Sequence, residues 1–463
     1  MTGAGKPAGS ARRLLCVSSA LDVRSADEPG GLRVCAPVLV GDLRLDARLP
    51  ELSAEGRYRA IRLLAWLHDR PIGEISLPLD AEPLGGSELA ERVWPLIAER
   101  VIAHYEDDGL PVPNRLPSAG LPRDERPPCG GRPADHLTMT VVIATRDRTE
   151  SLLRCLAALA RSSYPAFDVV VVDSAPSSDR TERALAEHPG WPFPLRYVRE
   201  SRPGLARAHN AALAATTGTV IAITDDDVEV DRDWLTVLAD SFAEPDVTCV
   251  TGPILPAELE TTAQVLVEEA GGFARGFRRR VFAMDMPDPG PLFPFTAGRF
   301  GSGANMAFRA GWLMARNGFD PALGAGTPAR GGDDLTAFLQ VIIDGGTLVY
   351  EPRAVVRHWH RREYEGMRRQ AFHYGVGLGA YLTAAVRAKP ALLGAMLVRA
   401  VPAVRHLLSP ASAKNANRGA RFPRELVWRE RAGVLAGPFG YLISRWRHRD
   451  RAPATPRRAG SSA

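Results

Sequence analysis

The sequence predicts an α/β protein whose central domain is a mostly parallel, Rossmann-like sheet, with an N-terminal α+β accessory domain and a C-terminal helical segment. Three observations support this division. From residue 137 to about 360, short apolar stretches alternate with amphipathic ones, which is the pattern of βαβ units. Residues 111–136 are dense in Pro, Gly and charge and are typical of a linker. Residues 361–449 are basic and contain helical stretches.

The length and composition fit a soluble protein of several domains. The 463 residues exceed one ordinary domain, and 45% of them are hydrophobic and 24% charged. The five cysteines are scattered without a CxxC pair, which argues against a disulfide framework and a structural zinc site. No apolar stretch follows the N-terminal charges, so we expect no signal peptide. We expect a cytoplasmic protein, located at the inner face of the cell membrane if its basic segment docks there.

The two ends and the first unit carry little chemical information. Residues 1–12 and 450–463 have the composition of disordered segments. Residues 13–110 predict an accessory domain, and we find no group of residues in it that suggests a chemical site. Its expected elements are strands at Leu14–Ser18 and Arg33–Val40, a hairpin of Tyr58–Trp66 and Ile72–Leu79, and a helix at Ser87–Tyr105.

The central domain, residues 137–360, contains continuous apolar strands that indicate a sheet buried on both faces. Helices are expected at Thr149–Ala160, Asp179–Glu187, Gly204–Ala215 and up to Phe242. Strands are expected at MTVVIAT, FDVVVVD, LRYVR, TVIAIT and VTCVTGPI, which begin at residues 139, 167, 195, 219 and 247.

Acidic residues follow three of these strands. Ligands of open parallel sheets bind beyond the carboxyl ends of the strands, so these positions are candidate ligand contacts. The acids repel one another, and a divalent cation would remove that cost. Oxygen ligands suit Mg²⁺ or Mn²⁺ bridging to phosphates, although three acids before a helix are also typical of simple capping. The residues are Thr145, Arg146, Asp147, Asp173, Asp225, Asp226 and Asp227.

Three further groups have both a functional and a structural interpretation. Asp333 and Asp334 begin a helix, where a carboxylate can be a general base or a solvated cap. FGSGANMAFR, which contains Gly303 and Asn305, either lets backbone approach a ligand or forms a tight loop before a strand. In His358-Trp359-His360, histidines that follow a strand are more often structural than metal ligands.

In their order along the chain, these motifs resemble family-2 inverting glycosyltransferases with the GT-A nucleotide-diphospho-sugar transferase fold. The resemblance covers residues 137–360, about half of the chain. The sequence departs from the family pattern at His209 (usually Arg), Ala212 (usually Gly), Asp333 (usually Glu) and Thr336 (often acidic). The motifs that carry the resemblance are VVIATRDR, VVVVDSAPSSDRT, GLARAHNAALAATTGTVIAITDDD, FGSGANMAFRA and GGDDL with DGGTLVYEPRAVVRH.

The resemblance implies sugar transfer, with inversion, from a UDP-, GDP- or dTDP-linked donor, assisted by Mg²⁺ or Mn²⁺. Asp334 would be the general base, and Asp333 would assist it and contact the acceptor with Gly303 and Asn305. Asp227 would bind the metal, together with Asp225 and His360. The implied donor contacts are Thr145, Arg146, Asp147, Asp173, Arg207, Asn210, Asp225 and Asp226.

Alternatives remain for the activity and for the basic segment. A nucleotidyltransferase shares the sheet but needs a Gly-rich basic loop after its first strand, and ATRDRTES has no glycine. A non-catalytic GT-A-like binding protein would not need acids at all three strand ends. Arg353–Arg449 contains 19 basic and 4 acidic residues, so it predicts peripheral contact with an anionic membrane and a lipid-linked glycan acceptor, or closure over a small metabolite. No aromatic-basic pattern indicates nucleic acid.

Overall fold

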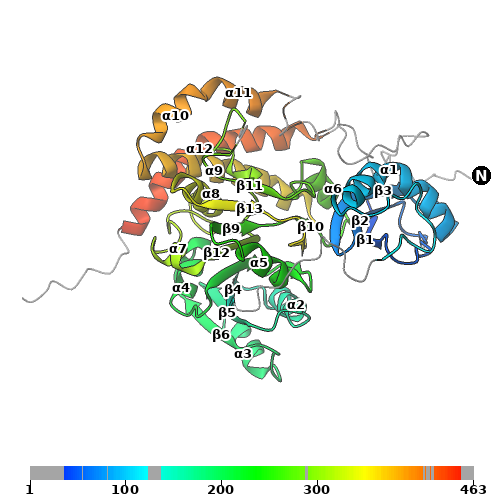
Figure 1. Cartoon of the computed structure of the whole chain (residues 1–463). Helices are drawn as coiled ribbons and strands as arrows, with labels where there is room; N and C mark the ends of the chain where they lie inside the picture. Colours follow the sequence, from blue (N-terminus) through cyan, green and yellow to red (C-terminus); the bar gives the residue numbers. More distant parts are fainter. Residues whose placement is uncertain are drawn as a thin grey trace, which may run out of the picture.

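The computed structural model describes residues 36–123, 137–286, 290–409 and 422–449, except Glu55 and Ala81, together with Ser412, Asn415 and Arg418. The predicted disordered ends, the strand at Leu14–Ser18 and residues 124–136 of the predicted linker lie outside this part. A small N-terminal sheet lies beside a large central sheet, and the C-terminal helices cover another side of that sheet (Figure 1).

The central sheet has eight strands in the order β11-β13-β9-β12-β7-β4-β5-β6. β4, β5, β6 and β7 are mutually parallel, which confirms the predicted fold class. β12 runs antiparallel to both β7 and β9, a direction that we did not predict. The bounds are β4 (Met139–Thr145), β5 (Phe167–Ser174), β6 (Leu195–Glu200), β7 (Val220–Asp225), β9 (Val247–Thr251), β11 (Arg280–Phe282), β12 (Asn305–Arg309) and β13 (Thr347–Tyr350).

Helices cover both faces of this sheet because strand side chains alternate between the faces. Val141 and Ile143 of β4 pack in one apolar cluster with α2 (Thr149–Leu159) and α5 (Trp234–Phe242). Val142 lies in a second cluster with α4 (Leu205–Leu213) and α8 (Asp333–Ile343). Burying each Val, Leu or Ile side chain stabilises the folded state by about 1.5–3 kcal/mol. This packing on both faces keeps the ends of the strands in place. The other elements are α3 (Arg180–Glu187), α7 (Ala310–Met314) and the 3₁₀ turn η1 (Ala297–Arg299).

A three-stranded sheet in the order β10-β14-β8 lies beyond the end of β7. It consists of β8 (Val228–Val230), β10 (Ile254–Pro256) and β14 (Val356–His358). α6 (Thr262–Glu269) follows β10 and begins with a capping box formed by Thr261 and Gln264. Because β8 starts directly after the acids at 225–227, this sheet fixes the backbone on the far side of those acids.

The N-terminal unit contains β1 (Val38–Arg44), β2 (Ala60–Leu67), β3 (Arg70–Pro78) and α1 (Gly86–Asp107). β2 and β3 form the predicted antiparallel hairpin, and α1 contains the predicted helix. The outer face of β2 packs on the central part of the chain, where Leu64 and Trp66 meet Leu255 and Val355. Each unit therefore buries apolar surface against the other.

The C-terminal segment consists of α9 (Tyr364–Ala388), α10 (Leu392–Val398), α11 (Ala400–Leu408) and α12 (Arg424–Arg449). Glycines let α9 and α12 approach to backbone distance: a Cβ on Gly437 would lie 2.5 Å from the Cα of Gly379. Gly375 faces Gly433 in the same way one turn earlier, so the two helices run parallel. None of the helices among the described residues has the length and apolar character that crossing a membrane requires.

Candidate functional site

The predicted strand-end residues gather at one edge of the central sheet. In the register of the sheet, Thr145 lies opposite Asp173, and Ala144 lies opposite Asp225. Since β12 is antiparallel to β7, its first residue, Asn305, pairs with Thr224 at this same edge. The loop that precedes β12 therefore faces the acids, although it lies 80 residues later in the sequence.

Asp226 and Asp227 share one guanidinium. The Nη1 atom of Arg148 lies 2.8 Å from Asp226 Oδ1, and its Nη2 atom lies 2.5 Å from Asp227 Oδ2. The Thr145 hydroxyl donates a 2.7 Å hydrogen bond to the other oxygen of Asp226. Asp226 is buried, so these bonds supply its solvation and fix the turn that follows β7.

The three adjacent acids differ in their affinity for protons. Burial, followed by the charge of Asp227, raises the pKa of Asp225 to about 7. Burial likewise raises the pKa of Asp226 to about 6, against the opposing charge of Arg148. Burial alone would also raise the pKa of Asp227, but His358 and Arg148 hold it well below its ordinary value. Asp227 is therefore the permanent negative charge of the group.

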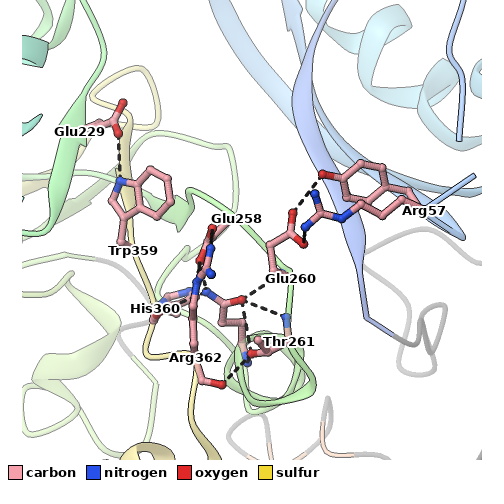
Figure 2. A network of polar contacts seen from close by, with 10 residues as sticks. Arg57, Glu229, Glu258, Glu260, Thr261, Trp359, His360 and Arg362 are labelled. Carbon is pink, nitrogen blue, oxygen red and sulfur yellow. Dashed lines mark hydrogen bonds and ion pairs between the residues drawn. The ribbon is translucent and has the colours of Figure 1, made fainter. Parts of the chain in front are cut away.

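His358, at the end of β14, contacts Asp227 directly. Its Nε2 atom lies 3.2 Å from Asp227 Oδ1, and the neighbouring residue, Trp359, donates its backbone N–H to the carbonyl of Asp227 at 2.9 Å. Figure 2 shows how the segment after β14 is held: the Trp359 indole donates to Glu229, and Arg362 pairs with Glu258. The Nδ1 atom of His358 lies 2.9 Å from His360 Nδ1, so the imidazole has a polar partner at each ring nitrogen.

Asp333 and Asp334 begin α8 and face the loop before β12. Asp334 Oδ2 accepts a 2.9 Å hydrogen bond from the backbone N–H of Gly303, and Oδ1 accepts one from Leu335 at 2.8 Å. Burial raises the pKa of Asp334, while these N–H donors lower it. Burial and then the charge of Asp334 raise the pKa of Asp333 to about 7, and Asp225 adds to that effect. The two acidic groups, 225–227 and 333–334, therefore share one electrostatic environment.

Asp173 and Asp147 lie at the side of the site toward β6. Tyr197 donates to Asp173 Oδ2 at 3.1 Å, and Asp173 Oδ1 is buried without a partner among the described residues. Asp147 has a positive φ of 54° and accepts both the backbone N–H and the hydroxyl of Ser177, each at 2.8 Å. Arg146 beside it is exposed. This side of the site therefore holds a buried acceptor atom whose hydrogen-bonding capacity is unused among the described residues.

Four of the predicted site residues have other partners in the structure. Arg207 lies 2.6 Å from the His448 ring of α12. Asn210 exchanges two 2.8 Å hydrogen bonds with the backbone of Phe319.

Asn305 is fully buried and bonds to Trp234, Pro253 and Ala354. The Nε2 atom of His360 lies 2.9 Å from Glu268, and its Nδ1 atom lies 2.9 Å from His358. Because these partners occupy their polar groups, we do not carry the four residues into the proposed site.

Three residues that were not among the predicted site residues lie at the site. Arg148 and His358 carry the positive charge that faces Asp227, and His209 has its Nδ1 atom 4.0 Å from Asp333 Oδ2. Burial lowers the pKa of His209 to about 4, so this ring is neutral where the family pattern has an arginine. The position of His358 two residues before His360 was the available signal, but only the direction of β14 shows which ring faces the acids.

Asp227 and His358 would hold a divalent cation once the imidazole gives up the proton that pairs it with Asp227, since only the neutral ring ligates a metal. Adjacent ligands of an octahedral ion are about 3 Å apart, given bond lengths near 2.1 Å, and Asp227 Oδ1 and His358 Nε2 are 3.2 Å apart. In the described part of the chain, the strand-end acids and His358 do not form a set of three whose ligand atoms all lie within 4.8 Å. Substrate phosphates and water would fill the remaining positions, as is usual for Mg²⁺.

Comparison with known proteins gives a family match for the part of the chain that carries the strand-end acids. The model of glycosyl transferase family 2 matches residues 140–313. The chain is 28% identical over 253 residues to the pre-mycofactocin glycosyltransferase of Mycobacterium tuberculosis, covering 54% of this chain and 48% of that protein. It is 28% identical over 225 residues to the succinoglycan biosynthesis protein ExoM of Rhizobium meliloti, covering 48% and 66%. The chain thus spans about half the length of the first of these relatives.

Among solved structures, the chain is similar to the mannosyltransferase PcManGT from Pyrobaculum calidifontis in complex with GDP-Man and Mn²⁺. The sequence identity is 22% and the TM-score 0.44, over 67% of this chain and 89% of that one. S. aureus TarS 1-349 in complex with UDP-GlcNAc matches with 13% identity and a TM-score of 0.38, over 68% and 92%. The family model thus identifies a glycosyl transferase family 2 domain at residues 140–313 of this chain.

Proposed function

We propose that this protein transfers a sugar from a nucleotide-diphosphate donor to an acceptor hydroxyl, with inversion at the anomeric carbon. The observation that carries the proposal is the convergence of Asp173, Asp227 and Asp334 at one edge of the sheet, together with the family membership of the domain. The reaction needs a donor site, a group that neutralises the diphosphate and a base, and the three carboxylates supply one group for each need.

The donor lies along the carboxyl ends of β4, β5 and β7. The free oxygen of Asp173 accepts an N–H of the nucleobase, and Asp147, Arg146 and Thr145 border the same end of the site. Asp227 and His358, with Asp225 beside them, hold Mg²⁺ or Mn²⁺. When bound, the cation neutralises the charge that develops on the leaving nucleoside diphosphate.

Asp334 acts as the general base. The acceptor oxygen attacks the anomeric carbon, the bond from that carbon to the phosphate oxygen breaks, and the hydroxyl proton passes to Asp334. Each oxygen of Asp334 accepts one backbone N–H and retains a lone pair for this proton. The raised pKa of Asp334 suits the task, because a base works best when its pKa approaches the working pH.

A panel of UDP-, GDP- and dTDP-linked sugars tests the activity. With Mn²⁺ present, we expect one donor to raise the melting temperature of the protein and to be hydrolysed slowly even without an acceptor. Binding without turnover in any acceptor mixture would indicate a non-catalytic GT-A-like protein. Release of inorganic pyrophosphate from a nucleoside triphosphate would indicate a nucleotidyltransferase instead.

The acceptor is delivered at a membrane surface. Twelve of the eighteen exposed large hydrophobic side chains among the described residues lie between positions 393 and 446. On α12 they recur at intervals of seven, four, three and four residues, which is one helical face, and arginines flank them. These residues are Trp428, Leu435, Phe439, Leu442 and Trp446.

An apolar face with tryptophans, set in a basic segment, matches the boundary of an anionic bilayer. A hollow of about 510 Å³ lies between this face and residues 326–330, which precede α8. It is lined by Phe439 and Ile443 of α12, by Val376 of α9 and by residues 326–328 and 330. Because Arg330 precedes Asp334 by four residues in the chain, we propose that the acceptor passes this hollow on its way to the base. This position favours a lipid-linked glycan acceptor over a soluble small metabolite.

Sedimentation with vesicles tests the docking surface. We expect the protein to bind phosphatidylcholine vesicles that contain phosphatidylglycerol, and to lose that binding at high salt or without the anionic lipid. Phe439→Ser with Trp446→Ser should weaken binding at least about 10-fold, since burying one such side chain is worth about 1.5–3 kcal/mol. Met314→Ser, an exposed apolar residue on the central domain, is the control. Binding that ignores both anionic lipid and the α12 variant would contradict the proposal.

A further inference from the structure

Three side chains converge in the N-terminal unit, outside the strand-end site. His68 lies at the turn of the β2–β3 hairpin, and His104 and Asp108 lie one helical turn apart at the end of α1. His68 Nδ1 is 3.2 Å from His104 Nε2 and 3.3 Å from Asp108 Oδ2, and His104 Nε2 is 3.4 Å from Asp108 Oδ2. This triangle could not be predicted from the sequence, because 36 residues separate the two histidines.

Hydrogen bonds between two neutral imidazoles and an ionised carboxylate cannot satisfy the triangle. If both ring nitrogens carry protons, both can donate to Asp108, but then two N–H groups oppose each other at 3.2 Å. If only one nitrogen carries a proton, the other nitrogen's lone pair faces a carboxylate oxygen. In every arrangement of neutral imidazoles, one edge is repulsive. A cation placed between the three atoms makes all of them acceptors and removes the conflict.

The edges of the triangle match a tetrahedral zinc site. With Zn–N bonds of about 2.0–2.1 Å and Zn–O bonds of about 2.0–2.2 Å, neighbouring ligand atoms of a tetrahedron are about 3.3–3.5 Å apart. The observed edges are 3.2, 3.3 and 3.4 Å. Two imidazole nitrogens and one carboxylate oxygen also suit zinc better than Mg²⁺, which prefers oxygen ligands in octahedral geometry.

The surroundings of the three side chains favour an ion as well. The exposed fractions of the side chains are 0% for His68, 12% for His104 and 7% for Asp108. Among the described residues, the ion-pair partners of the buried Asp108 carboxylate are these two imidazoles. His68 Nε2 has no partner, so this ring makes its polar contacts through Nδ1.

We propose that His68, His104 and Asp108 bind one zinc ion, with a water molecule or an added ligand in the fourth position. The ion fixes the tip of the β2–β3 hairpin to the end of α1. The hairpin and the helix are the two layers of this unit, so the ion adds a link between the layers to the apolar packing of Leu67 and Tyr105. The inference does not depend on the proposed function.

Metal titration of the full chain tests the proposal. After treatment with a chelator, we expect one Co²⁺ per chain to bind with the visible absorption of a four-coordinate ion, and Zn²⁺ to displace it. Asp108→Asn keeps the size of the side chain and should raise the dissociation constant for Co²⁺ by more than about 100-fold, since even residues that only orient a ligand contribute roughly 10–100-fold. Asp107→Asn, an exposed neighbour on the same turn, should bind like the wild type.

Two controls keep the outcome clear. Asp227→Ala alters the strand-end site and should leave the Co²⁺ spectrum unchanged. Zn²⁺ should raise the melting temperature of the wild type, but not that of Asp108→Asn or His104→Gln. A wild-type chain that takes up no Co²⁺ or Zn²⁺ at micromolar concentration, or an Asp108→Asn variant with wild-type affinity, would overturn the proposal.

Discussion

Replacing Asp334 with asparagine is expected to reduce turnover by about 10²–10⁴-fold, the usual cost of removing a general base. The amide keeps the shape of the side chain and can still accept the N–H of Gly303 at one oxygen. It cannot take the proton of the attacking hydroxyl. Donor binding should stay nearly intact, because Asp334 lies on the acceptor side of the site, and calorimetric titration with the donor would measure that binding.

The pH profile gives a second measurement of the same role. Since burial raises the pKa of Asp334, the deprotonated base is lost as the pH falls through a value above the ordinary Asp pKa of about 3.9. On the acid side of the pH profile, the turnover of the wild type should therefore begin to fall at a pH above the ordinary Asp pKa. Asp344→Asn, at the other end of α8, is the matched control and should retain activity. Wild-type turnover in Asp334→Asn would remove this residue from the mechanism.

Replacing Asp227 with alanine is expected to abolish both the dependence on a divalent metal and the binding of the donor. Asp227 is the acid that stays ionised, and its carboxylate faces His358 and Arg148. Without it, the cation loses its charged ligand, and the positive charges of Arg148 and His358, which Asp227 otherwise balances, repel a divalent ion. A metal-dependent donor therefore loses its anchor and its neutralising charge in the same change.

Calorimetric titration with the nucleotide, with and without Mn²⁺, measures this effect. The wild type should bind the nucleotide more tightly with Mn²⁺, and Asp227→Ala should show no difference between the two titrations. Asp246→Ala, an exposed aspartate at the start of β9, serves as the control for general loss of charge. A variant that keeps a Mn²⁺-dependent donor affinity would show that the metal is held elsewhere.

The fold could be predicted from the sequence to the extent that local periodicity determines it. Continuous apolar strands such as MTVVIAT and FDVVVVD can only be buried on both faces, so the parallel order of β4, β5 and β7 followed. The direction of β12 could not be predicted in this way. Asn305–Arg309 is apolar enough to be a strand in either direction, and its pairing with β7 and β9 is decided by tertiary contacts.

The candidate site shows the same limit. Strand ends are local features, so the positions of Asp173 and Asp225 could be predicted from the sequence. The partners of these acids could not, because Arg148, His358 and Gly303 reach the site from other elements. Asn305 illustrates the converse, since its amide holds Trp234 and two backbone carbonyls in the interior. A polar residue in a motif that resembles a family can therefore have a structural role, when the buried polar groups around it have no other hydrogen-bond partner.

The glycine contacts of α9 give the C-terminal helices a mechanical role. Gly377 packs on Gly331 and Gly332, directly before Asp333 and Asp334, while Gly375 and Gly379 pack on α12. No side chain lies between these backbones to absorb a displacement. If the outer face of α12 rests on lipid, Asp334 is held at a constant height above it. The enzyme would then select among chemically similar acceptor hydroxyls by their distance from the bilayer surface.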